Sequence, residues 1–167
     1  FDVSAAYEAC VKLSRADTSG IAACVPRHKV REVIPDERRM RWRDGFIACD
    51  SARESVAKAL EYAYDDWCIA RMAEAVGDTA GERVYDEMAR SYRGYYDFKT
   101  GFMRGRKADG SWRTPFDPFR SEHRVDDYCE GNAWQWTWFV PHDIEGLIAL
   151  MGGERQFVRR PDELFSA

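Results

Sequence analysis

Apolar residues recur every three or four positions along most of this chain, and no useful stretch shows the strict alternation of a β-strand. Their spacing predicts a first helix over residues 2 to 15. Residues 16 to 50 are less regular, because glycine and proline interrupt them. Within them, the arginine-rich segment 27–43 is predicted to be a solvated loop. Acidic residues divide its positive charge, which argues against an anion-binding arm.

Two long helices joined by a tight turn form the clearest predicted unit. Ser51 and Glu54 have the spacing of a capping box, so a helix is predicted to begin at Ser51 and to end at Gly77. A second helix is predicted over roughly residues 79 to 96, with Asp78 at its start. Because the connection is short, the two helices are expected to form an antiparallel hairpin.

The last third of the chain predicts a long loop followed by shorter helices. Glycine and proline punctuate residues 97 to 126, and a long loop inside a compact domain is usually functional. Helices are predicted over about 132–139, from Pro141 to a stop at Gly152, and over about 154–165. The pattern therefore predicts an all-α fold of helical hairpins, with long loops gathered at one end.

Composition narrows the class of protein. The 167 residues correspond to one domain or to part of a larger one, and 45% apolar with 32% charged residues is typical of a soluble globular protein. A net charge of -4 gives no basic footprint, so nucleic acid is not an expected partner. No apolar run of 18 residues occurs, so no membrane span is expected. The chain begins at Phe1 without a signal-peptide pattern, which favours a processed chain or a fragment.

Cysteine and histidine spacing predicts no metal site within these residues. The five cysteines contain no Cys-x-x-Cys pair, and their odd number fits free thiols at least as well as disulfides. The three histidines have no ligand-like spacing.

A tryptophan-rich block, residues 127–143, carries the best candidate chemistry. Glu130 precedes Asn132, Trp134 and Gln135. Indole faces can cover the apolar side of a sugar ring while amides bond to its hydroxyls. Apolar surface also disfavours the charged form of a neighbouring carboxylate, as a general acid requires. We therefore interpret Glu130 as a candidate general acid. The alternative is a helix-capping carboxylate, because the helix dipole alone favours a negative charge there.

Other polar residues admit both a functional and a structural reading. Asp65 and Asp66 point about 100° apart on a helix, so at most one lines a pocket; otherwise one is solvated and the other bonds to a loop backbone. Arg104 suits sugar hydroxyls or a structural carboxylate, and an ion pair that locks the loop is the more common arrangement. Asp117 is predicted to form an Asx-type turn, and Asp143 to cap a helix.

Four blocks in order resemble the catalytic module of glycoside hydrolase family 92, the calcium-dependent exo-acting α-mannosidases. They comprise Glu54–Ala73, Thr100–Trp112, Pro115–Pro118 and the Glu130 block, which continues through Gly146 to Gly153. The match covers most of residues 45 to 165, whereas residues 21 to 44 match poorly and are left unassigned.

The resemblance implies an inverting enzyme in which a β-sandwich packs on an (α/α)6 barrel. Residues 1–167 are then expected to be a fragment of that barrel, without the β-sandwich and the remaining barrel. The family's general acid is the glutamate of its Glu-Gly-Asn-Ala-Trp-Gln block, so this role carries over to Glu130. The expected substrate-binding residues are Asn132, Trp134, Gln135 and Arg104.

The family's base and metal segments do not occur in this sequence. The base lies in a Gly-Asn-Asp-Asp block and calcium is bound through a Gly-Asn-Glu-Pro-type segment, both further downstream. Calcium is therefore expected in the intact parent, with ligands outside this chain. The expected partner is a mannose-containing glycan and the parent is expected to be secreted or periplasmic. The isolated chain is expected to be inactive and to self-associate. The alternatives are another (α/α)6 glycosidase, glucoamylase-like or trehalase-like, or a non-catalytic helical sugar-binding module.

Overall fold

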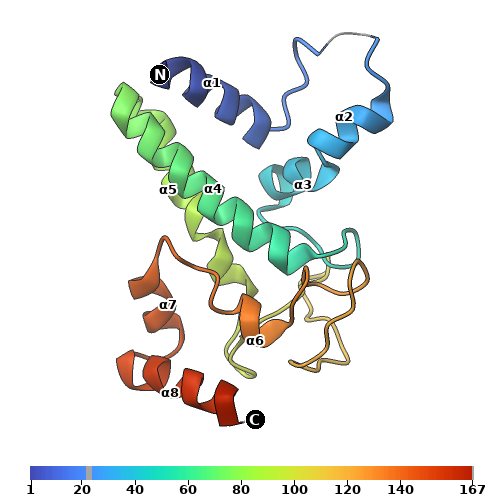
Figure 1. The fold of residues 1–167 in the computed structure, drawn as a ribbon, viewed down its shortest axis with the longest axis vertical. Coiled ribbons are helices and arrows are strands. Elements are labelled where there is room, and N and C mark those ends of the chain that lie inside the picture. The colour runs from blue at the N-terminus through green and yellow to red at the C-terminus, as the bar shows by residue number, and fades with distance from the viewer. Residues whose placement is uncertain (22–23, 167) are drawn as a thin grey trace.

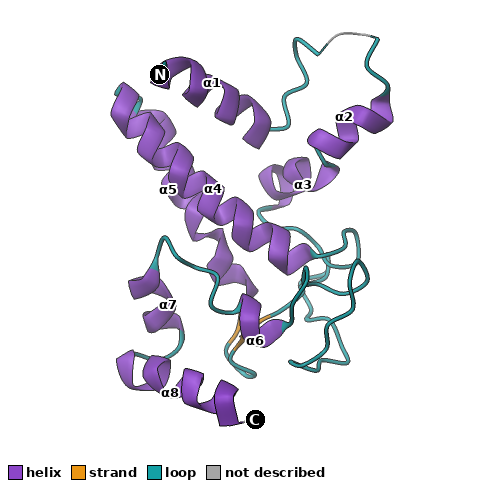
Figure 2. Cartoon of the chain, viewed as in Figure 1, coloured by secondary structure: helices purple, strands orange, loops and turns teal. Residues whose placement is uncertain are grey.

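Helices dominate the computed structural model, which describes residues 1–21 and 24–166 (Figures 1 and 2). The elements in chain order are α1 (Val3–Ser14), α2 (Arg27–Val33), α3 (Asp36–Asp44), α4 (Ser55–Val76), α5 (Thr79–Ala89), the 3-10 helix η1 (Arg90–Tyr95), β1 (Tyr96–Asp97), β2 (Phe102–Met103), α6 (Ala133–Trp136), α7 (Ile144–Leu150) and α8 (Glu154–Ser166). The all-α prediction is confirmed. The two short strands pair antiparallel, with Tyr96 opposite Met103.

The antiparallel hairpin of α4 and α5 forms the spine of the molecule (Figure 1). Gly77 ends α4 in the left-handed conformation, and the Asp78 carboxylate accepts the Gly81 amide at 2.9 Å to cap α5. Helix α1 packs on the hairpin, and the Tyr7 hydroxyl donates to Asp78 at 2.7 Å. The predicted hairpin is confirmed, although its second arm changes from α-helix to 3-10 helix at Arg90.

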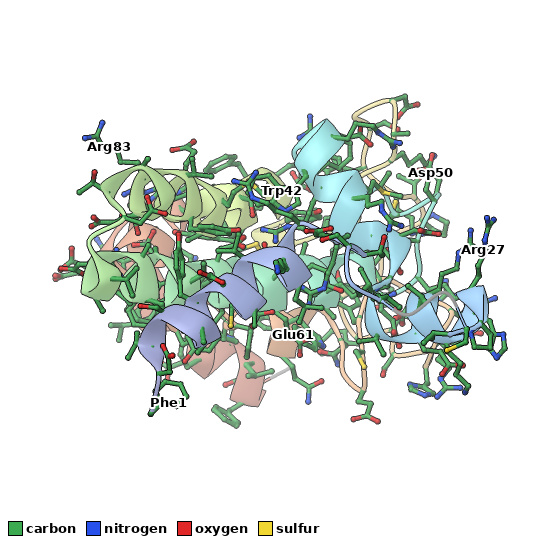
Figure 3. All side chains as sticks on the ribbon, turned by 90° about the horizontal axis from the view of Figure 1, so that it is seen from above. Phe1, Arg27, Trp42, Asp50, Glu61 and Arg83 are labelled. Atoms are coloured by element: carbon green, nitrogen blue, oxygen red, sulfur yellow. The ribbon has the colours of Figure 1, made fainter. Side chains whose placement is uncertain are left out.

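The prediction of a solvated loop over residues 27–43 is wrong, because this segment forms α2 and α3. Arg41 of α3 is buried and pairs with the buried Asp66 of α4. The Trp42 indole N–H donates to the Ser14 carbonyl at 2.8 Å, and this half-buried side chain lies among the helices in Figure 3. Asp65 is exposed as predicted, whereas Asp66 bonds to an arginine side chain and not to a loop backbone.

The predicted start of α4 at a Ser51–Glu54 capping box is also wrong. The helix begins at Ser55, and Glu54 has a left-handed backbone with φ of 54°. The amide of Glu54 donates to the Asp126 carbonyl at 2.9 Å, and those of Val56 and Ala57 donate to the Asp127 carbonyl at 3.0 and 3.2 Å. A distant segment of the chain thus caps α4.

The largest hydrophobic cluster lies where the end of the hairpin meets the strands and the helices α6 and α7. It includes Leu60, Tyr92, Met103, Trp134 and Leu147. The long loop predicted for residues 97–126 is confirmed apart from the short strand pair, and it gathers with the 126–132 segment beside the start of α4 (Figure 2).

Helix α6 ends earlier and helix α7 begins later than predicted, whereas α8 begins at Glu154, as predicted. Helix α6 covers only Ala133–Trp136, and α7 begins at Ile144 rather than at Pro141. Asp143 caps α7, as predicted, by accepting the Gly146 amide at 2.9 Å. None of the helices described is both long and apolar enough for a bilayer.

Candidate active site

Glu130 occupies a strained turn immediately before α6. Its φ of 49° is left-handed, a conformation that costs a non-glycine residue about 1–2 kcal/mol. Its side chain is exposed, and it does not serve as the N-cap of α6, because Asn132 does. The capping hydrogen bond therefore falls to Asn132, and the Glu130 carboxylate is exposed to solvent.

The backbone on both sides of Glu130 is held by side chains of α6. Before it, the Cys129 carbonyl accepts the Trp136 indole N–H at 2.9 Å. After it, the Asn132 amide donates to the Gln135 side chain at 3.0 Å, and the Gln135 amide donates to the Asn132 side chain at 3.3 Å. This reciprocal capping box fixes where the turn enters the helix.

Asn132 and Gln135, both predicted to bind substrate, therefore have a structural task as well. Their side-chain oxygens are used by the capping box. The box does not involve their NH2 groups, which keep their donors for a ligand. Gln135 is exposed and Asn132 is half-buried.

Trp134, another predicted substrate-binding residue, lies in the core. It is 7% exposed, meets Phe102 edge to face at 4.8 Å between ring centroids, and has the Arg160 guanidinium 4.6 Å from its ring centroid. Its indole N–H is buried and has no partner among the residues described. In this structure Trp134 packs within the hydrophobic core at the start of α6. Its contact with a sugar stays a prediction.

Arg104 forms the loop-locking ion pair that was its structural alternative. Its guanidinium is buried, donates to Asp97 at 2.6 Å and to the Arg113 carbonyl at 2.7 Å, and stacks 4.2 Å from the Phe116 ring centroid. Burial would raise the pKa of Asp97, but hydrogen bonds from Arg104, the Lys99 amide and Thr100 lower it below its usual range. A role of Arg104 in sugar binding stays a prediction.

The surroundings of the Glu130 turn are acidic. Burial, followed by the charges of Glu54, Glu130 and Glu61, raises the pKa of the Cys129 thiol. Burial together with Asp65 and Glu54 likewise raises the pKa of Glu61. The five cysteines, this one included, are free thiols.

The residues described do not fit a calcium ion. No group of three or more His, Cys, Asp or Glu side chains in residues 1–21 and 24–166 is arranged to hold a metal. Calcium favours six to eight oxygen ligands, which this turn does not assemble.

Sequence reasoning missed a buried network beside the site. The Asp127 carboxylate accepts the Ser55 hydroxyl at 3.0 Å and the Arg113 guanidinium at 2.9 Å. Its partners lie 72 and 14 residues away, so no local spacing signals the contact. The smaller prediction for Asp117 is confirmed, because its carboxylate accepts the Phe119 amide at 2.9 Å.

Known proteins match most or all of this chain. The model of the glycosyl hydrolase family 92 catalytic domain matches residues 1–167. The fold is similar to a family 92 inverting mannosidase from Bacteroides thetaiotaomicron, with a TM-score of 0.84 and 35% identity over 97% of this chain and 20% of that one. It is also similar to an α-mannosidase of that family and organism, solved with mannoimidazole, with a TM-score of 0.80 and 37% identity over 100% and 20% of the two chains.

A curated relative agrees. An uncharacterised secreted glycosidase from Arthroderma benhamiae is 26% identical over an alignment of 141 residues, and the match covers 71% of this chain and 18% of that protein. The chain thus spans about a fifth of the length of the relatives it matches. Its fold, the Glu130 turn and the full-length family match lead to one assignment: the chain belongs to glycosyl hydrolase family 92 and forms a segment of its catalytic domain.

Proposed function

We propose that residues 1–167 supply the general acid of an exo-acting α-mannosidase that removes terminal α-mannose residues from glycans. Glu130 is that acid. The observation that carries the proposal is its exposed carboxylate on a strained turn that α6 side chains hold from both sides. Strained backbone at a non-glycine residue is typical of functional sites.

In the proposed reaction, the protonated Glu130 carboxyl donates its proton to the glycosidic oxygen as the bond to the anomeric carbon breaks. The departing sugar leaves as a neutral alcohol. A water attacks the opposite face of the mannose ring, and the base that activates it lies about 6.5–9.5 Å from the acid in inverting enzymes. We assign that base and the calcium ligands to parts of the protein outside this chain.

Two similarities support the substrate class. One similar structure is named as an inverting mannosidase, and another α-mannosidase was solved with mannoimidazole. The match to a family 92 catalytic domain replaces the glucoamylase-like and trehalase-like alternatives. The description of the curated relative as secreted supports secretion or a periplasmic location for the complete protein.

The test compares two substrates in the complete protein that carries this chain. Glu130→Gln keeps the size of the side chain and removes the proton. An unactivated mannobioside should lose about 10²–10⁴-fold in kcat/KM, whereas an aryl mannoside with a very acidic leaving group should lose far less.

Glu145→Gln serves as the matched control, because Glu145 is an exposed glutamate in the first turn of α7. It should leave both rates unchanged. If Glu130→Gln lowers both rates equally and slightly, Glu130 is not the acid. If the wild type binds mannosides without cleaving them, the protein is the sugar-binding module of the remaining alternative.

A further inference from the structure

The turn that carries Glu130 is anchored to the rest of the molecule through Asp127, three residues earlier. Asp127 is buried at 4% exposure, and both of its carboxylate oxygens are used. One accepts the Ser55 hydroxyl at 3.0 Å, and the other accepts the Arg113 Nε at 2.9 Å. Ser55 opens α4 and Arg113 lies in the 97–126 loop, so this single carboxylate joins three segments.

The backbone of the same residue makes a second attachment. The Asp127 carbonyl accepts the amides of Val56 and Ala57 at 3.0 and 3.2 Å. These amides belong to the first turn of α4, whose donors have no partner within the helix. The chain at Asp127 therefore cannot shift without exposing the start of α4.

The Asp127 carboxylate lies directly against the loop backbone at Gly105. A Cβ atom placed on Gly105 would lie 1.9 Å from the Asp127 Oδ2. The Arg113 guanidinium, which holds that oxygen, also donates to the Cys49 carbonyl. Glycine at position 105 is therefore what lets the carboxylate lie against the loop backbone.

Further hydrogen bonds hold the chain between Asp127 and Glu130. The Tyr128 hydroxyl donates to the Met103 carbonyl at 2.8 Å, and the Cys129 carbonyl is held by Trp136. From Asp127 to the capping box at Asn132, contacts to α4, β2 and α6 fix the chain before and after Glu130.

We propose that Asp127 is a positioning residue for Glu130: through Ser55, Arg113 and the start of α4, it sets where the catalytic carboxyl meets the glycosidic oxygen. The proposal rests on the function proposed above, and it gives Asp127 an effect on the reaction that acts through Glu130. A general acid must lie within hydrogen-bond distance of the oxygen that it protonates. If the turn shifts, the rate should therefore fall as it does when the acid is removed.

The variant Asp127→Ala tests this in the complete protein. It removes both side-chain acceptors, so kcat for an unactivated mannobioside should fall at least about tenfold more than kcat for an activated aryl mannoside. The KM values should change little. Asp127→Asn retains an acceptor for Arg113 and a donor for the Ser55 hydroxyl, so it should restore much of the lost rate.

Asp66→Ala is the matched control. Asp66 is also a buried aspartate that accepts a serine hydroxyl, from Ser14, and an arginine, Arg41, but these bonds join α1, α3 and α4. Its loss should lower both rates equally, through the folded fraction alone. If Asp127→Ala also lowers both rates equally, while Glu130→Gln does not, the positioning role is overturned and the proposed function stands.

Amide hydrogen exchange provides a readout that needs no reaction. Asp127→Ala should speed exchange at residues 54–57 and 128–132, and Asp66→Ala should speed it in α1 and α3 instead. Where Asp127→Ala does not fold, Ser55→Ala removes one of the two bonds and should show the same pattern more weakly. Unchanged exchange at residues 128–132 overturns the positioning role, even if no mannoside is cleaved and the proposed function fails.

Discussion

At the scale of single residues, the left-handed conformation of Glu130 has an energetic consequence. Glycine follows it at position 131, yet the positive φ falls on the glutamate. Gly131 has a different reason to be glycine, since a Cβ there would lie 2.8 Å from the Gln135 side-chain oxygen. The chain thus accepts strain at the residue that presents the carboxylate, which is the pattern expected when position matters more than stability.

Replacing Glu130 by glycine should therefore remove activity without destabilising the protein. Glycine relieves about 1–2 kcal/mol of left-handed strain, while its greater freedom in the unfolded chain costs about 0.5–1 kcal/mol. We expect the unfolding free energy of Glu130→Gly to equal that of wild type or to exceed it by up to about 1.5 kcal/mol. Glu130→Ala keeps the strain and is the control. An unfolding midpoint of the glycine variant below that of the alanine variant would contradict this account.

The Asp97–Arg104 pair should make the free energy of unfolding depend on pH in the acidic range. Its hydrogen bonds lower the pKa of Asp97 in the folded state, so the unfolded chain binds the proton more readily. The pair therefore stabilises the fold above the ordinary aspartate pKa of about 3.9, and this contribution is lost as pH falls through the lower folded value.

Near neutral pH, Asp97→Asn should cost about 3–5 kcal/mol, because it leaves the Arg104 charge buried without its counterion. The difference in unfolding free energy between wild type and Asp97→Asn should shrink as pH falls below about 4. A difference that is constant from pH 7 to pH 3 would show that the ion pair is not its source.

At the scale of elements, the helices that the sequence predicted well are those whose ends are local. Gly77 ends α4 and Asp78 caps α5 through contacts within a few residues. The local sequence was therefore enough to predict both helix ends. The start of α4 was misplaced because its amides bond to carbonyls at positions 126 and 127. Helices α2 and α3 were missed because the buried pair of Arg41 with Asp66, not local pattern, ties α3 to α4.

The same reasoning explains what could be known of the site. Glu130, Asn132 and Gln135 are close in sequence, and the structure brings them together at one turn. An ion pair of Arg104 was expected as the more common arrangement for a loop arginine, but its partner, Asp97, is identified only by the structure. The Asp127 network was not foreseen, because its serine lies 72 residues away.

Helix α1 should be coupled to the α4–α5 turn through one hydroxyl. Tyr7 donates to Asp78, and burial followed by this bond raises the pKa of Tyr7 to about 12. Asp78→Ala should lower the free energy of unfolding, because it removes both the cap of α5 and the acceptor of the bond from Tyr7.

Tyr7→Phe removes only that bond and should cost about 0.5–1.5 kcal/mol. In the double variant the two losses should be less than additive, because they share the same contact. Strict additivity in a double-mutant cycle of unfolding free energies would show that α1 is held by packing alone.

At the scale of the whole molecule, the chain exposes apolar side chains that could be buried against the rest of a complete catalytic domain. Exposed residues of this kind include Val33, Phe98, Phe119, Val125 and Val158. Exposed apolar surface promotes association when it is contiguous over several hundred Å². We expect residues 1–167 alone to dimerise or aggregate at micromolar concentration. A cooperative, monomeric species in sedimentation velocity over that range would refute this expectation.

The chain alone should also fail as an enzyme, for a reason separate from its association. Inversion requires one carboxyl to protonate the leaving group and a second, about 6.5–9.5 Å away, to activate water. In the function proposed above, Glu130 supplies the first, and the second, with the calcium ligands, is assigned to the rest of the protein.

Residues 1–167 should therefore release no mannose from α-mannosides, with or without added calcium, even from an aryl mannoside that needs no acid. The aryl mannoside makes the test decisive, because its leaving group departs without a proton from Glu130. Its hydrolysis then depends only on a base that activates water. Calcium-stimulated release of mannose from the aryl mannoside by the purified chain would place the base within these residues, and release from an unactivated mannobioside that is lost in Glu130→Gln would place both carboxylates there. Glu54 and Glu61, which lie with Glu130 around the Cys129 thiol, would then be the first candidates for the base.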